Sequence, residues 1–201
     1  MKFPENTIEI AALQPDYLGF IFYDLSPRNI TEKLPEINAS IKKVGVFVNA
    51  NFEEILQKAN EYQLDFIQLH GEETAEFCEK IEANSLKVIK SFNIHNQFNF
   101  NILNDYINSC SYFLFDTKGK NYGGNGIPFD WQLLKNYTLE KMYFLSGGIG
   151  LENLLEVTEF LKTKHAKKCI AIDCNSKLEI SPGLKSKNKV KTFITTIKNQ
   201  S

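Results

Sequence analysis

The chain has 201 residues, 43% of them hydrophobic, and a formal net charge of -1 from 23 Lys and Arg against 24 Asp and Glu. This composition fits one globular domain spanning residues 1–201, because no linker or low-complexity stretch divides the chain. Lysines are spread along the chain and no apolar stretch approaches the roughly 18 residues of a membrane span, so we expect a cytoplasmic protein with neither nucleic acid nor a membrane as partner.

The residue pattern predicts helices that alternate with short strands. The first element is a helix over residues 4–13, with Pro4 in its first turn. Runs of apolar, β-branched or aromatic residues, each typical of a buried strand, cover residues 17–23, 43–48, 65–69, 87–91, 112–115, 142–145 and 169–173. Segments of helical period lie between or after them, at residues 51–63, 72–83, 97–108, 150–163 and 187–199. This alternation is typical of βα units around a parallel sheet.

The spacing of the strands favours a barrel. Strand starts about 25 residues apart suit one short strand, one helix and two loops. Because a helix precedes the first visible strand, one further step back places an eighth strand before Met1. We therefore expect an α/β fold, a (β/α)8 TIM barrel that apparently lacks its first strand, with two unpaired sheet edges as a result. An open seven-stranded sheet with helices on both faces is the alternative.

Polar residues follow most of the predicted strands, at the ends where barrels of this type build their sites. They are Asp24 to Arg28, Asn49, His70 to Glu73, Asp116 to Lys118, Ser146 to Gly150 and Asp173 to Ser176. A glycine-rich stretch, residues 122–126, allows the backbone rotations that a lid needs, and we expect it to close over a bound substrate.

Several motifs occur together in a fixed order along the chain. They are Gly19-Phe-Ile-Phe-Tyr23, Ser26-Pro-Arg28, Val44-Gly-Val-Phe-Val-Asn49, Gln68-Leu-His-Gly71, Phe115-Asp116, Gly123-Gly-Asn-Gly-Ile-Pro-Phe-Asp-Trp131 and Ser146-Gly-Gly148. In this order and spacing the chain resembles the phosphoribosylanthranilate isomerase family of tryptophan biosynthesis over nearly its whole length. The resemblance implies a (β/α)8 barrel that rearranges N-(5'-phosphoribosyl)anthranilate to 1-(2-carboxyphenylamino)-1-deoxyribulose 5-phosphate, an Amadori rearrangement that uses no metal or organic cofactor.

The resemblance also implies roles for individual residues. Asp116 matches the family's general acid, which protonates the ribose ring oxygen so that the ring opens. Arg28 matches the residue that binds the anthranilate carboxylate, for which a planar guanidinium is suited. His70 and Gln68 are expected to face the pocket and to bind the substrate.

The substrate phosphate is expected at the ends of the last two strands. Backbone N–H groups bind such a dianion, and the residues expected to supply them are Gly147, Gly148, Asn175 and Ser176. Lys177 stands where the family more commonly has Gly, so the path of this loop departs from the family pattern. The expected partner is thus a small phosphorylated substrate, and the protein is expected to be a monomer or a homodimer.

The chain lacks one motif of the family. There, the base that removes the C2' proton is a cysteine in a Lys-x-Cys-Gly motif at the end of the first strand. None of the cysteines here, Cys78, Cys110, Cys169 and Cys174, lies in such a motif, and without a C-x-x-C pair they suggest neither a disulfide framework nor a zinc site. Cys174 is the cysteine nearest the expected pocket and is the candidate for a substitute base.

The missing motif and the missing strand fall at the same place, which leaves two interpretations open. Either the numbering begins at an internal Met and the motif is encoded upstream, or the protein is a truncated, catalytically inactive barrel that at most binds a phosphorylated ligand. Related phosphate-binding barrels fit less well: indole-glycerol-phosphate synthase needs more Lys and Glu at its strand ends, and a pentose-phosphate epimerase needs metal-binding His and Asp that this chain lacks.

Overall fold

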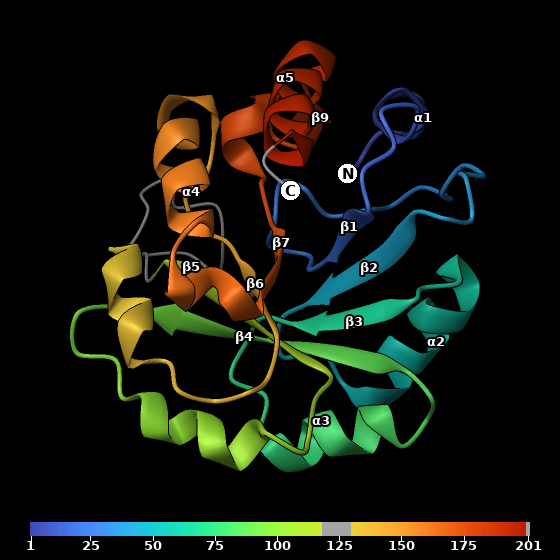
Figure 1. Cartoon of the computed structure of the whole chain (residues 1–201). Helices are drawn as coiled ribbons and strands as arrows, with labels where there is room; N and C mark the ends of the chain where they lie inside the picture. Colours follow the sequence, from blue (N-terminus) through green and yellow to red (C-terminus); the bar gives the residue numbers. More distant parts are fainter. Residues whose placement is uncertain (118–129, 200–201) are drawn as a thin grey trace.

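The computed structural model describes residues 1–117 and 130–199 (Figure 1). One parallel sheet contains seven strands in the order of the sequence: β1 (Tyr17–Phe22), β2 (Lys42–Phe47), β3 (Phe66–Leu69), β4 (Lys87–Ile94), β5 (Tyr112–Thr117), β6 (Tyr143–Leu145) and β7 (Cys169–Ile172). All seven predicted strands are confirmed. The predicted α/β class is confirmed as well.

The helices follow the strands and cover the sheet. They are α1 (Pro4–Ala11), α2 (Phe52–Tyr62), α3 (Ala75–Glu82), α4 (Leu154–Leu161) and α5 (Lys187–Lys198), with short 3-10 helices η2 (Trp131–Asn136), η3 (Leu151–Asn153), η4 (Lys164–Lys168) and η5 (Ser176–Leu178). Side chains cap several of them at the N-terminus, as when Asn51 accepts a hydrogen bond from the backbone of Glu54 in α2. None of the described helices is long and apolar enough to cross a membrane.

One predicted helix is wrong in kind. Residues 97–108 were expected to form an α-helix, but the structure has a 3-10 helix, η1 (Phe100–Tyr106), followed by a turn. The asparagines in this segment explain the difference, because their side chains bond to nearby backbone groups. Asn99 accepts from the Asn101 N–H, and Asn104 donates to the Asn101 carbonyl. Such local bonds compete with the α-helical ladder.

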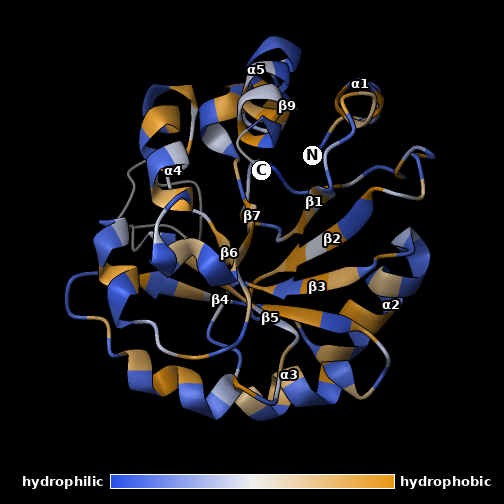
Figure 2. Cartoon of the chain, in the orientation of Figure 1, coloured by the Kyte–Doolittle hydropathy of each residue, from blue (hydrophilic) through white to orange (hydrophobic). Residues whose placement is uncertain are grey.

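Two apolar clusters lie on the two faces of the sheet. The larger one lies between the strands and the helices and includes Phe20, Ile67 and Phe113. The smaller one consists of strand residues: Val44, Phe66, Ile89, Leu114 and Phe144, with Tyr17, Tyr112 and Ala171 packed against them. Figure 2 shows hydrophobic residues along the strands, with hydrophobic and hydrophilic residues alternating on the helices.

The smaller cluster shows that the sheet is curled. The ring of Tyr17 on β1 packs edge-on against Phe66 on β3 and Phe144 on β6, with centroid distances of 5.7 and 5.1 Å. A residue of the first strand can reach one of the sixth only if the sheet bends around this cluster. The cluster contains no helix residue, which argues against the alternative with helices on both faces.

The sheet is open between β1 and β7, and the two ends of the chain meet there. Among the described strands, β1 pairs with β2 alone and β7 with β6 alone. The Asn6 side chain in α1 accepts from the Lys185 N–H at 2.8 Å and donates to the Lys185 carbonyl at 3.0 Å. The amino group of Met1 donates to the carbonyl of Gly19. Figure 1 shows α1 and α5 beside this opening.

A short hairpin follows the last strand of the sheet. Its strands β8 (Glu179–Ser181) and β9 (Leu184–Lys185) are antiparallel and place Glu179 opposite Lys185. The turn between them needs Gly183, whose φ of 85° lies in the left-handed region. This hairpin did not form part of the predicted elements.

Candidate functional site

A cavity of about 260 Å³ lies on the concave face of the sheet. Its floor belongs to the small apolar cluster, and its walls come from the carboxyl ends of the strands together with α1, α5 and the β8–β9 hairpin. Because side chains alternate along a strand, each inner apolar residue is followed two positions later by another inner residue. Leu114 is thus followed by Asp116, and Phe144 by Ser146. Ala171 is followed in the same way by Asp173, and all these residues line the cavity.

Asp116 and His70 lie side by side in this cavity. Both are buried, and Nε2 of His70 is 3.3 Å from Oδ2 of Asp116. Nδ1 of His70 lies 2.9 Å from the Gln68 amide nitrogen and 3.0 Å from the Ser91 hydroxyl. An amide nitrogen only donates, so Nδ1 accepts and the proton of the neutral ring is assigned to Nε2.

The Nε2 atom of His70 has no well-aligned hydrogen bond to any described residue, although Asp116 is close. A buried N–H group without an acceptor is costly, so a ligand oxygen in the cavity would stabilise it. The structure therefore brings together the predicted residues Gln68, His70 and Asp116, with Gln68 orienting the histidine.

A second carboxyl group lies near Asp116 and belongs to a residue that was expected at this edge of the sheet without an assigned role. Asp173, just after β7, accepts a hydrogen bond from the Ser146 hydroxyl at 3.0 Å. Burial raises the pKa of Asp173, and the negative charge of Asp116 raises it further. Its proximity to Asp116 could have been predicted from the sequence, because Asp173 follows its strand in the same way that Asp116 does.

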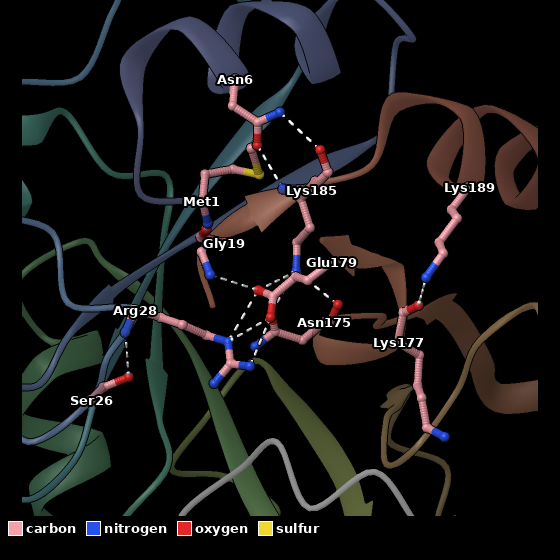
Figure 3. A network of polar contacts seen from close by, with 11 residues as sticks. Met1, Asn6, Gly19, Ser26, Arg28, Asn175, Lys177, Glu179, Lys185 and Lys189 are labelled. Carbon is pink, nitrogen blue, oxygen red and sulfur yellow. Dashed lines mark hydrogen bonds and ion pairs between the residues drawn. The ribbon is translucent and has the colours of Figure 1, made fainter. Parts of the chain in front are cut away.

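Arg28 lines the cavity but is already paired. Its Nη2 atom donates to Oε2 of Glu179 at 2.7 Å, and its Nε atom contacts both carboxylate oxygens at 3.0 Å (Figure 3). Burial alone would raise the pKa of Glu179, but the hydrogen bonds from Arg28 and the charge of Lys185 hold it below its usual value. The sequence pattern did not predict that Glu179 contacts Arg28, because the two residues lie 151 positions apart.

Lys185 connects this ion pair to the end of β7. Its ammonium lies 3.1 Å from Oε1 of Glu179 and donates to the backbone carbonyl of Asn175 at 2.9 Å and to the Asn175 side chain. Burial lowers the pKa of Lys185, against the opposing effect of Glu179. Asn175 lines the cavity, as expected, but its side-chain oxygen is bonded to Lys185.

The other three predicted phosphate-binding residues, Gly147, Gly148 and Ser176, are not among the described residues that line the cavity. Gly147 has a φ of 98°, and a Cβ there would lie 2.2 Å from Oγ1 of Thr117 and 3.0 Å from Oδ1 of Asp116. Only glycine lets this loop lie so close to Asp116.

Lys177, which departs from the family pattern in this corner, is ion-paired with Glu152 at 2.6 Å. The lid predicted at residues 122–126 lies outside the described residues.

The cysteines do not supply a base among the described residues. Burial raises the pKa of the Cys174 thiol well above its ordinary value, and the charge of Asp173 adds to the effect, although Cys174 lines the cavity. Burial also raises the pKa of Cys78, Cys110 and Cys169 to about 12. A thiol needs its thiolate form to act as a base or nucleophile, so none of these fits the task near neutral pH. Within residues 1–117 and 130–199, no group of His, Cys, Asp and Glu could hold a metal.

The curled parallel sheet and the acid–base cavity at its carboxyl edge define a small-molecule enzyme of the βα class. A family model described as N-(5'-phosphoribosyl)anthranilate (PRA) isomerase matches residues 2–196. The chain belongs to this family.

Relatives and solved structures agree with this assignment. The N-(5'-phosphoribosyl)anthranilate isomerase of Parabacteroides distasonis is 42% identical, with 98% of this chain and 90% of the relative aligned. The crystal structure of the Thermus thermophilus phosphoribosyl anthranilate isomerase has a TM-score of 0.83 and 28% identity, covering 100% of this chain and 96% of that one. A further isomerase structure, 30% identical with a TM-score of 0.79 over 99% and 95% of the two chains, holds reduced 1-(o-carboxyphenylamino)-1-deoxyribulose 5-phosphate.

Proposed function

We propose that this protein catalyses the Amadori rearrangement of N-(5'-phosphoribosyl)anthranilate to 1-(2-carboxyphenylamino)-1-deoxyribulose 5-phosphate, a step of tryptophan biosynthesis, as a single-domain enzyme of the cytoplasm. The observation that carries the proposal is the buried Asp116 beside His70, in the cavity of a chain that belongs to the isomerase family. The reaction is an isomerisation, so no external oxidant or reductant has to be supplied.

Asp116 would act as the general acid. It protonates the ribose ring oxygen, the C1'–O bond breaks, and the nitrogen lone pair forms a protonated Schiff base at C1'. Removal of the C2' proton then gives an enolamine, which becomes the ketone when C1' takes up a proton and the C2' hydroxyl loses one. His70 donates from Nε2 to a ligand oxygen next to Asp116, which uses the hydrogen-bonding capacity that the described residues leave open.

The two anionic ends of the substrate would bind at two neighbouring positions in the cavity, which Lys185 and Glu179 connect. Arg28 binds the anthranilate carboxylate through the edge formed by Nη1 and Nη2, because Glu179 occupies the other edge. The phosphate binds in the corner formed by Gly147, Gly148, Asn175 and Ser176, where the loops after β6 and β7 meet. Their proximity is supported by Gly150, where a Cβ would lie 2.6 Å from Cβ of Lys177.

We further propose that the complete fold is a (β/α)8 barrel and that its first strand, with a Lys-x-Cys-Gly motif, belongs in the opening between β1 and β7. Two observations support this placement. A Cβ at Gly19 on β1 would meet no atom within 4 Å, so this position faces open space. Strand β7 is partly exposed along its length, whereas β3 and β6 are fully buried, as strands of a closed parallel sheet are.

The test begins with the nucleotide sequence in frame upstream of the Met1 codon, over about fifteen codons, the reach of one strand and its loops. If Lys-x-Cys-Gly is encoded there, a gene that includes these codons should restore growth to a tryptophan auxotroph that lacks the isomerase. The same gene with Asp116→Asn, an isosteric change that removes the acid, should fail to do so. We call the product of this gene the extended protein.

A soluble extended protein that does not restore growth would overturn the isomerase proposal. Binding of the reduced product analogue without turnover, measured by calorimetry, would instead identify an inactive barrel that only binds a phosphorylated ligand.

A further inference from the structure

Arg28 has two edges that can bind a carboxylate, and one of them is occupied. The Nε and Nη2 atoms form the side edge, and both donate to Glu179. Figure 3 shows one guanidinium nitrogen without a partner, and Nη1 has no acceptor among the residues that the structure describes. Arg28 lines the cavity, so the edge formed by Nη1 and Nη2 is available there for a second carboxylate.

Glu179 is itself held in place on several sides. It accepts hydrogen bonds from the Gly183 N–H and from the Lys185 ammonium, both at 3.1 Å, in addition to those from Arg28. Its side chain is only 4% exposed, and the pairing of β8 with β9 sets its position relative to Lys185. A carboxylate with this many donors cannot follow a moving guanidinium, so it fixes the orientation of Arg28.

The charges of Arg28, Glu179 and Lys185 distinguish two possible effects of Glu179 on ligand binding. Arg28 and Lys185 carry two positive charges against the one negative charge of Glu179. If only charge mattered, removal of the Glu179 carboxylate would strengthen the binding of an anionic ligand. If orientation matters more, the same removal would release the Arg28 side chain and weaken binding, because ordering a free side chain costs conformational entropy.

We propose that Glu179 is a positioning residue, which holds the side edge of Arg28 so that the Nη1–Nη2 edge binds the aromatic carboxylate of the ligand. The identity of this ligand rests on the proposed function. The held orientation of Arg28 does not.

The binding test uses two ligands that differ at one end. They are the reduced 1-(2-carboxyphenylamino)-1-deoxyribulose 5-phosphate and the same compound with an unsubstituted phenyl ring. Glu179→Gln and Glu179→Asp should each weaken binding of the carboxylate-bearing ligand about tenfold, the effect of one charge-assisted hydrogen bond, and leave the phenyl ligand unaffected. If Glu179→Gln fails to fold, Glu179→Asp still provides the test, because it keeps the negative charge opposite Lys185 and only shortens the side chain.

The matched control is Glu152→Gln, which removes a carboxylate paired with Lys177 in the same group of loops without contacting Arg28. Its affinity for both ligands should stay within about twofold of the unaltered chain. Arg28→Ala should likewise weaken binding of the carboxylate-bearing ligand and not of the phenyl ligand. The double variant should bind the carboxylate-bearing ligand no more weakly than Arg28→Ala alone. Unchanged or tighter binding in both Glu179 variants, equal weakening for the two ligands, or additive effects would each overturn the proposal.

A spectroscopic measurement keeps this inference separate from the proposed function. Without ligand, the Nε–H proton of Arg28 should exchange with water about tenfold faster in Glu179→Asp than in the unaltered chain, because its acceptor has moved away. If neither ligand binds the unaltered chain, the proposed function fails, but the exchange rate still shows whether Glu179 fixes the orientation of Arg28. An unchanged exchange rate would overturn the positioning itself.

Discussion

The Nε2 atom of His70 lies 3.3 Å from Oδ2 of Asp116, although β4 separates the strands β3 and β5 that these residues follow or belong to. The curl of the sheet brings the two side chains together on its concave face. Gln68 and Ser91 hold the ring from the opposite side. The orientation of the histidine is therefore set before any ligand arrives.

We predict that His70→Leu lowers kcat of the extended protein by about tenfold or more, because the Nε2–H group that would donate to a ligand oxygen beside Asp116, the proposed general acid, is lost. His95→Asn, away from the cavity, should leave kcat unchanged. Steady-state kinetics with N-(5'-phosphoribosyl)anthranilate measures both. A loss confined to KM would show that His70 contributes only to binding.

The loop that carries His70 depends on a buried ion pair. Glu73 accepts from Lys90 at 2.9 Å and from the backbone N–H groups of Asn49 and Gly71, and the side chains of Glu73 and Lys90 are each 3% exposed. We predict that Lys90→Met lowers the free energy of unfolding by about 3 kcal/mol, since an unpaired carboxylate would stay buried. Lys42→Met, which removes the partly exposed ion pair with Asp65, should lower the free energy of unfolding by about 1 kcal/mol or less. Urea denaturation measures both variants, and an equal decrease in the free energy of unfolding for Lys90→Met and Lys42→Met would contradict the structural role of the buried pair.

The glycine next to Asp116 gives a third prediction. Gly147→Ala should lower the free energy of unfolding by about 2 kcal/mol, because alanine is strained at a φ of 98° and its Cβ would overlap Thr117. Gly19→Ala is the matched control, since a Cβ there meets no atom within 4 Å. Thermal unfolding of both variants tests this, and a Gly147→Ala variant as stable as Gly19→Ala would contradict it.

In the 201-residue chain, the buried amino group of Met1 makes stability depend on pH, whereas in the extended protein the same nitrogen would be a peptide amide and would not titrate. Burial, with Lys185 nearby, lowers its pKa from 8.0 to about 5 in the folded chain. Between these values the unfolded chain binds more protons than the folded chain, so the free energy of unfolding should rise with pH, by about 4 kcal/mol at most from pH 5 to pH 8. Acetylation of the amino group should remove this part of the slope. Urea denaturation at both pH values checks it, and identical slopes for the two forms would refute the assignment.

The apolar runs predicted the strands well, because each strand of a buried parallel sheet is a nearly continuous apolar segment. The polar residues that follow these runs predicted that His70 and Asp116 gather at one edge, and Gln68 was expected there from the resemblance. The sequence pattern could not show that Glu179 pairs with Arg28, since an ion pair between distant residues leaves no periodic signal. The hairpin that carries Glu179 has strands of only three and two residues, too short for an alternation to be visible. The asparagine-rich segment at residues 97–108 forms a 3-10 helix instead of the predicted helix, because its apolar spacing is helical while its asparagine side chains favour local bonds.

The bonds across the opening of the sheet join residues that are far apart in the chain. Asn6 and Lys185 are separated by 179 positions, and Arg28 and Glu179 by 151. Closing such long loops costs entropy, which is recovered only when the structure is nearly complete. The end of the cavity that contains Arg28 should therefore assemble last during folding and open first. A ligand that binds Arg28 in its held orientation would therefore also hold the two ends of the chain together, and its affinity would add to the stability of that closure.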